Sequence, residues 1–215
     1  MLRALIFDFD GLILDTETPI IDAYEAVHQA HAKPFDRAVF TRNIGHADFL
    51  FDPWAAFGKG ADLNSLEGER REVRNALMLR QPILPGVQDL LGAASASGLL
   101  LGVASNSGHE WVEGHLHRLG LHHHFSCFSC RGDTPSPKPE PDIYRHALNG
   151  LGVLPAQAVA FEDSAIGVLA AARAGLRVVA VPNASTHGHV FDLASLVLPS
   201  LLGLGLERIA TLPSR

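Results

Sequence analysis

Two aspartates, Asp8 and Asp10, follow a short apolar segment near the beginning of the sequence. If this segment is a strand, both side chains lie on the same face, where their charges repel unless a cation or a proton lies between them. A hard metal ion such as Mg²⁺, bound by oxygens at the end of a buried strand, removes this repulsion most simply. The alternative is structural, because an Asp-rich turn can also cap the segment that follows it.

Three further groups of polar residues lie at or near the ends of apolar segments. They are Ser105-Asn106-Ser107 after Leu99–Ala104, Lys138 within residues 136–142, and Glu162-Asp163-Ser164 after Ala158–Phe161. Taken alone, each group has an ordinary explanation as a helix cap, a loop charge or an acidic pair at a helix start. The carboxyl ends of parallel strands, however, meet at the edge of a sheet where ligands bind. Their joint placement therefore favours one functional site.

The apolar segments are short, and several contain β-branched residues, which is typical of strands buried on both faces of a parallel sheet. They are Leu2–Phe9, Leu99–Ala104, Phe125–Phe128, Ala158–Phe161 and Val178–Val181. Helical patterns alternate with them at Val87–Ala96, Glu110–Leu119, Pro141–Leu151 and Ala165–Ala174, and a short strand and helix are expected from Leu193 onward. This alternation predicts an α/β fold with an open parallel sheet flanked by helices.

One region interrupts the alternation, between the first strand and the next helix of the core. It has no convincing strand pattern, but apolar residues recur with helical spacing near both of its ends. Pro82 and Pro85 would mark the return to the core. We therefore expect a core domain of residues 1–15 and 82–215, and an all-helical domain of residues 16–81 inserted after the first strand.

Composition limits the classes of protein to which the chain can belong. With 215 residues, 47% of them apolar, it can bury a large core, and its net charge of −6 provides no basic field for nucleic acid or anionic lipid. Two cysteines are too few for a secreted disulfide scaffold, and Asp8 and Asp10 interrupt what would be the apolar region of a signal peptide. We expect a cytoplasmic protein that binds neither nucleic acid nor membranes. Its oligomeric state stays open, and a monomer is compatible with the sequence.

The two cysteines raise the alternative of a zinc site. Cys127 and Cys130 follow three histidines, residues 122–124, and the Cys-x-x-Cys spacing is one that zinc sites use. A single such pair is a weak zinc signal, and in a strand the two sulfurs would start on opposite faces. The sequence therefore does not favour a zinc site at these residues.

The order of the polar groups resembles that of the motifs of the haloacid dehalogenase superfamily. The segment Asp8–Thr16 is similar to its first motif, Ser105 to its second, Lys138 to its third and Glu162-Asp163 to its fourth. The resemblance is most specific in the segments around the third and fourth motifs, and it extends over most of the chain. It implies a Rossmann-like core, with a helical insertion similar to the small cap of the branch that contains β-phosphoglucomutase and many sugar-phosphate phosphatases.

The resemblance also implies a reaction and the residues that perform it. Asp8 would be the nucleophile that forms an aspartyl-phosphate, and Asp10 would donate a proton to the leaving alcohol and then accept one from water. Lys138 would neutralise Asp8 and a phosphoryl oxygen, while Ser105 and the amide of Asn106 would hold the phosphoryl group. Because true haloacid dehalogenases lack the second aspartate, dehalogenation is not expected.

Mg²⁺ is the implied cofactor. Its ligands would be Asp8, Asp163 and the backbone carbonyl of Asp10, and Glu162 would contact it directly or through water. Octahedral Mg²⁺ usually keeps several waters, so few protein ligands suffice.

Substrate choice is expected to depend on the inserted helices. Gly45 and His46 fall where the family places a specificity loop over the active site. In this loop a β-phosphoglucomutase has basic residues that hold a second phosphate, whereas here the sequence is Ala47-Asp48-Phe49, and Ile20 replaces a histidine of the first cap helix. We therefore expect hydrolysis of a small phosphorylated metabolite, a sugar phosphate, rather than phosphomutase activity.

A catalytically silent module that binds a metabolite or a partner protein is the alternative of another class. The intact set of Asp8, Asp10, Lys138 and Asp163 argues against it, because a buried charge cluster is costly to keep without a use.

Overall fold

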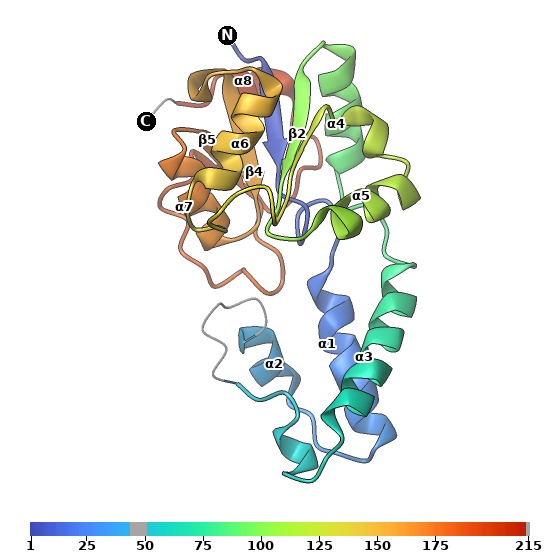
Figure 1. Ribbon diagram of the computed structural model, residues 1–215. Helices are drawn as coiled ribbons and strands as arrows, with labels where there is room; N and C mark the ends of the chain where they lie inside the picture. The colour runs from blue at the N-terminus through green and yellow to red at the C-terminus, as the bar shows by residue number, and fades with distance from the viewer. Residues whose placement is uncertain (44–50, 214–215) are drawn as a thin grey trace. The chain divides into compact units, whose positions relative to one another are not determined.

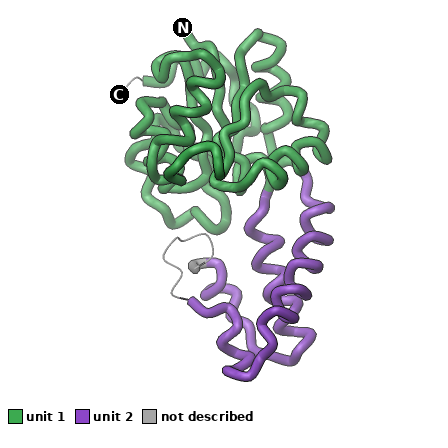
Figure 2. Tube along the Cα trace, in the orientation of Figure 1, with its two compact units in different colours: residues 1–14, 83–215 green, residues 15–82 purple. Residues whose placement is uncertain are grey.

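The computed structural model describes residues 1–43 and 51–213, and the chain forms two compact units. The first unit consists of residues 1–14 and 83–215, and the second of residues 15–82 (Figure 2). The chain leaves and re-enters the first unit at an isolated antiparallel bridge between Leu14 and Ile83.

The first unit contains a sheet of six parallel strands (Figure 1). The strands are β1 (Ala4–Phe7), β2 (Leu100–Ala104), β3 (Cys127–Ser129), β4 (Ala158–Glu162), β5 (Arg177–Ala180) and β6 (Leu196–Val197), in the order β3-β2-β1-β4-β5-β6. Every residue of β1 is buried, which explains its uninterrupted apolar sequence. The predicted open parallel α/β sheet is confirmed.

The order of the strands determines where a ligand can bind. β1 pairs with β2 on one side and with β4 on the other, so the chain connections depart from β1 in opposite directions. In open α/β sheets such a reversal opens a crevice outside the carboxyl ends of the strands. The residues that follow β1 therefore occupy the position at which a site is expected.

Helices cover both faces of the sheet (Figure 1). They are α4 (Val87–Ala96), α5 (His109–Arg118), α6 (Asp142–Leu151), α7 (Ala165–Arg173) and α8 (Leu206–Ala210). Ile6 of β1 lies in one buried cluster with Ala147 of α6 and Val168 of α7. On the opposite face, the rings of Phe7 and Phe161 stack with centroids 4.6 Å apart. Burial on both faces fixes the positions of β1 and β4, whose ends carry the candidate site.

The third strand differs from its predicted bounds by about two residues, because the chain turns before it. Residues His122–His124 form a short 3₁₀ helix, and the N–H of Phe125 donates to the carbonyl of His122 at 3.1 Å. Phe125 therefore ends this turn, and the strand begins at Cys127.

The described part of the second unit is helical, as the sequence predicted. It contains α1 (Glu17–Ala30), α2 (Arg37–Asn43), a 3₁₀ helix (Ala55–Phe57) and α3 (Leu63–Met78). Its apolar core is rich in aromatic side chains and includes Tyr24, Phe40 and Trp54. Among the helices of residues 1–43 and 51–213, none combines the length and the apolar character that crossing a bilayer requires.

Candidate active site

The predicted catalytic residues converge at the carboxyl edge of the sheet. Asp8 directly follows β1, Ser105 follows β2, and Glu162 is the last residue of β4. Lys138 lies in the loop between β3 and α6. Residues that are far apart in the sequence thus meet where the strand order reverses.

Lys138 is the centre of a buried ionic network. Its Nζ donates to Asp8 Oδ1 at 2.7 Å and to Glu162 Oε1 at 2.6 Å. The side chains of Lys138, Asp8 and Glu162 are 4%, 9% and 0% exposed, so water screens these charges poorly. Tyr144 of α6 donates its hydroxyl to the same Glu162 oxygen. Sequence reasoning did not assign a role to Tyr144, because nothing in its position marks it as a partner of a residue in β4.

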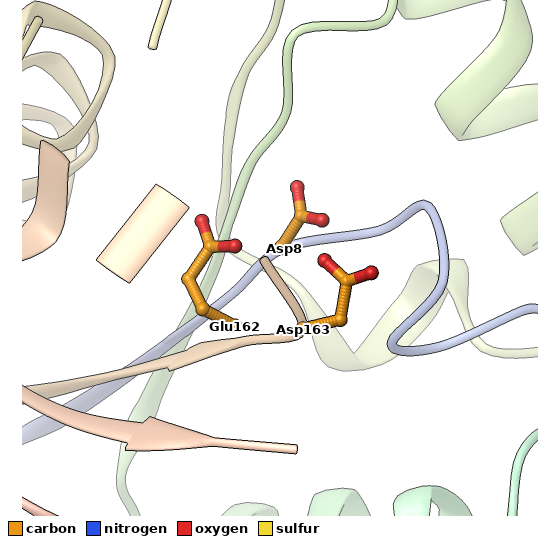
Figure 3. A group of neighbouring side chains, drawn as sticks. All are labelled: Asp8, Glu162 and Asp163. Atoms are coloured by element: carbon orange, nitrogen blue, oxygen red, sulfur yellow. The ribbon is translucent and has the colours of Figure 1, made fainter. Parts of the chain in front are cut away.

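Three buried carboxylates lie close together at this edge: Asp8, Glu162 and Asp163 (Figure 3). Each of them offers a ligand atom, and these atoms all lie within 4.8 Å of one another. Carboxylate oxygens are the ligands that hard divalent cations prefer. When ionised, the three carboxylates and Lys138 leave a net charge of about −2 by simple counting, which a divalent cation would neutralise. The residues present therefore fit a hard divalent ion.

The pKa values at the site reflect this crowding of buried charge. Burial raises the pKa of Asp8, Lys138 opposes the shift, and the nearby carboxylate of Glu162 adds to it. Burial acts to lower the pKa of Lys138, but Asp8 and Glu162 outweigh this effect and raise it. The lysine consequently stays charged, and a further cation at Asp8 would favour the ionised carboxylate that a nucleophile requires.

The side chain of Asp10 points to a different set of partners from that of Asp8. Its Oδ2 accepts from the hydroxyls of Ser107 at 2.7 Å and Ser105 at 3.2 Å, and its Oδ1 accepts from the indole Nε1 of Trp111 at 2.9 Å. The side chain of Asp10 is not part of the carboxylate group that could hold a metal among the described residues. Its implied contribution to the metal, through the backbone carbonyl, stays a prediction. Three donors hold the carboxylate itself, and its role in proton transfer also stays a prediction.

Asn106 holds the backbone of Lys138 through two hydrogen bonds. Its Oδ1 accepts from the N–H of Lys138 at 2.9 Å, and its Nδ2 donates to the carbonyl of Lys138 at 3.4 Å. The loop after β2 thereby holds the loop that carries Lys138. The predicted use of the Asn106 amide to bind a phosphoryl group concerns its backbone and stays a prediction.

Asp163 is held by a residue that sequence reasoning missed. Asn183 Nδ2 donates to Asp163 Oδ2 at 2.7 Å and to the carbonyl of Gly11 at 3.3 Å. The only sequence signal for Asn183 was its place after the strand predicted at Val178–Val181. Gly11 is required here because its φ is +75° and because a Cβ atom would clash with Asp163 Oδ2.

Two other groups of residues were considered from the sequence: the specificity loop and the cysteine pair. Gly45 and His46 lie outside the described residues. Within residues 1–43 and 51–213, the three carboxylates are the one group of three or more His, Cys, Asp or Glu side chains arranged to hold a metal, and this group contains neither Cys127 nor Cys130. His122 instead contacts Glu113 at 3.0 Å.

A comparison with models of protein families tests whether the chain belongs to the superfamily that its motifs resemble. The model of the haloacid dehalogenase-like hydrolases matches residues 2–175. The chain belongs to this family. The expected superfamily is therefore confirmed.

Curated relatives of this haloacid dehalogenase-like hydrolase extend over most of its length. The protein named "Putative phosphatase YhcW" of Bacillus subtilis (strain 168) is 40% identical over 196 residues, which cover 89% of each chain. Hexitol phosphatase B of Escherichia coli (strain K12) is 32% identical over 208 residues, which cover 94% of this chain and 93% of the relative. Both relatives are named phosphatases, in agreement with the expectation of an enzyme of this type.

A solved structure supports the same relationship at the level of the fold. The crystal structure of CbbY from Rhodobacter sphaeroides in complex with phosphate matches with a TM-score of 0.76 and 29% identity. The match covers 95% of this hydrolase and 97% of CbbY.

Proposed function

We propose that the chain is a Mg²⁺-dependent phosphatase that hydrolyses a small phosphorylated metabolite, a sugar phosphate, in the cytoplasm. The observation that carries this proposal is the contact of Lys138 with Asp8 beside the carboxylates of Glu162 and Asp163. A carboxylate can approach an anionic phosphate only where positive charge offsets the repulsion. The relatives named as phosphatases support the reaction, and Hexitol phosphatase B supports a phosphorylated sugar or sugar alcohol as the substrate class.

In the first step Asp8 Oδ attacks the phosphorus atom, and the bond between phosphorus and the leaving oxygen breaks. Asp10 gives its proton to that oxygen, so that the product leaves as a neutral alcohol. Lys138 offsets charge on Asp8 and on a phosphoryl oxygen, and Ser105 binds the phosphoryl group. When bound by Asp8, Asp163 and the backbone carbonyl of Asp10, with Glu162 in contact directly or through water, Mg²⁺ would supply additional positive charge at the phosphoryl oxygens.

In the second step water attacks the phosphorus of the aspartyl-phosphate and Asp10 accepts its proton. The acyl phosphate bond breaks, which releases inorganic phosphate and restores the carboxylate of Asp8. Asp10 is thereby protonated again and ready for the next alcohol.

Release of p-nitrophenol from p-nitrophenyl phosphate tests the proposal directly. We expect release with Mg²⁺ and its loss with EDTA, followed by turnover of sugar phosphates with free phosphate as the product. The variant Asp10→Asn should lower turnover of a sugar phosphate by roughly 10²-fold or more, because a general acid and base contributes on this scale, and it should retain the wild-type melting temperature. Activity without a divalent ion, normal turnover by the variant, or an isomerised sugar phosphate in place of free phosphate would contradict the proposal.

A further inference from the structure

Trp111 contacts the residue to which we assign proton transfer. Its indole Nε1 donates to Asp10 Oδ1 at 2.9 Å, while Ser107 and Ser105 donate to Oδ2 at 2.7 and 3.2 Å. Trp111 lies in the first turn of α5, and the loop before this helix carries both serines. One loop and the start of one helix therefore supply a separate set of donors to each carboxylate oxygen.

The donors on the two oxygens differ in what they can do. An indole N–H can only donate a hydrogen bond, whereas a serine hydroxyl can turn and accept one. A proton on Oδ1 of Asp10 would face the N–H of Trp111, so that two hydrogens would oppose each other. A proton on Oδ2 can be accepted by the hydroxyl of Ser105 or Ser107.

We infer that Trp111 is a positioning residue that keeps Oδ1 of Asp10 as a permanent acceptor and confines the transferable proton to Oδ2. This inference rests on the proposed function, in which Asp10 protonates the leaving alcohol. The proton then lies on the oxygen that faces Ser105, the residue proposed to bind the phosphoryl group. It passes from Oδ2 to the leaving oxygen as the bond to phosphorus breaks, and Oδ2 takes a proton from the attacking water in the second step.

Trp111 packs against another ring of the first unit. Its ring meets that of His115 edge to face, with centroids 4.4 Å apart. His115 in turn lies 6.2 Å from the ring of Phe9, the residue between the two aspartates. A phenylalanine at position 111 keeps an aromatic ring in this cluster and removes the indole donor.

The sharpest test compares substrates whose leaving groups need a proton to different degrees. The constant kcat/KM covers substrate binding and the steps up to departure of the leaving group. Nitrophenolate departs without a proton, whereas the alcohol of β-glycerol phosphate needs one. We expect Trp111→Phe to lower kcat/KM for β-glycerol phosphate roughly tenfold or more, and for p-nitrophenyl phosphate less than about threefold, because a general acid contributes roughly 10²–10⁴-fold.

The chain contains a matched control. Trp54 is the other of its two tryptophans, and its Nε1 donates to the carboxylate of Glu67 at 3.0 Å in the second unit. Trp54→Phe removes the same kind of hydrogen bond, and we expect it to leave the ratio of the two kcat/KM values unchanged. Equal losses for both substrates in Trp111→Phe, or no loss for either, would overturn the inference and leave the phosphatase intact. If the wild-type enzyme releases phosphate from neither substrate, the proposed function is overturned, and the inference with it.

A second readout does not depend on activity. The two indole N–H groups give two NMR signals, which the two Trp→Phe variants assign. In Asp10→Ala the signal of Trp111 should move because its acceptor is lost, while that of Trp54 should stay in place. A Trp111 signal that does not move would show that the hydrogen bond is absent in solution and would overturn the inference.

Discussion

Asn183 and Asp163 are joined by a hydrogen bond of 2.7 Å from Nδ2 to Oδ2, although they follow different strands of the sheet. The amide of Asn183 is itself held in one orientation, because its Oδ1 accepts from the backbone N–H groups of Ser185 and Thr186 at 2.9 and 3.1 Å. The loop after β5 thus determines the direction of a carboxylate that the proposed metal requires.

Removal of this hydrogen bond should weaken Mg²⁺ binding. We expect Asn183→Ala to lower the affinity about 10- to 100-fold, because partners that orient metal ligands contribute on this scale. Titration calorimetry and the dependence of the melting temperature on Mg²⁺ concentration would measure the change. Asn149→Ala, at an exposed position of α6, is the control and should retain the wild-type affinity. An unchanged affinity in Asn183→Ala would mean that Asp163 does not depend on this contact.

Loss of the buried ammonium should reduce stability as well as activity. Lys138→Met leaves Asp8 and Glu162 buried without their cation, and we expect the free energy of unfolding in the absence of metal to fall by about 3–5 kcal/mol. Urea unfolding would measure this. Arg173→Met breaks the exposed pair with Glu140, whose side chains are 45% and 54% exposed, and should cost less than about 1 kcal/mol. Similar small losses in both variants would show that the buried network contributes little.

Two glycines separate the effect of backbone strain from that of steric conflict. Gly11 and Gly152 both have a positive φ, +75° and +63°, but a Cβ atom at Gly11 would clash with Asp163 and one at Gly152 would meet nothing within 4 Å. Gly11→Ala should therefore destabilise the protein more than Gly152→Ala and should also weaken Mg²⁺ binding. Thermal unfolding with and without Mg²⁺ would measure both effects. Equal destabilisation would attribute the role of Gly11 to its backbone alone.

The contacts of His109 predict a dependence of stability on pH. The hydrogen bond with Asp133 raises the pKa of His109, burial opposes the shift, and Glu113 adds to it. Because the folded-state pKa lies above the unfolded value, the stabilisation is complete below that value, about 6.5, and is lost as the pH rises through the folded-state pKa.

The difference in unfolding free energy between the wild type and His109→Gln should therefore shrink as the pH rises above about 6.5 and through the raised folded-state pKa. The whole effect should stay below about 1 kcal/mol, since the side chain is 44% exposed and solvent screens the pair. Urea unfolding at several pH values would measure it. A difference that grows with pH would contradict the assignment.

The main elements of the core could be predicted because their patterns are local. β1 is apolar at every position, and α4 has the predicted bounds Val87–Ala96. The strand order reverses at β1, so the general rule for open α/β sheets was enough to bring Asp8 close to Glu162. The displacement of β3 arose from a 3₁₀ turn that a short apolar run does not reveal.

The partners of the proposed catalytic residues could not be predicted in the same way. Tyr144, Trp111 and Asn183 contact the site through side chains whose direction depends on the rotation of a helix or the path of a loop. Periodicity indicates which face of a helix is buried, but it does not identify the atom that a hydroxyl or an indole meets. A polar residue after a predicted strand was a usable signal for Asn183 alone.

The bridge between Leu14 and Ile83 brings together the two points at which the helical insertion begins and ends. All six strands of the sheet lie outside the inserted segment, and among residues 1–43 and 51–213 none of them pairs with a residue of that segment. Because the entropy of closing a loop grows only slowly with its length, insertions of other sizes could be joined at the same two points. Substrate preference could then diverge among descendants of one ancestor while the phosphoryl-transfer apparatus was inherited unchanged.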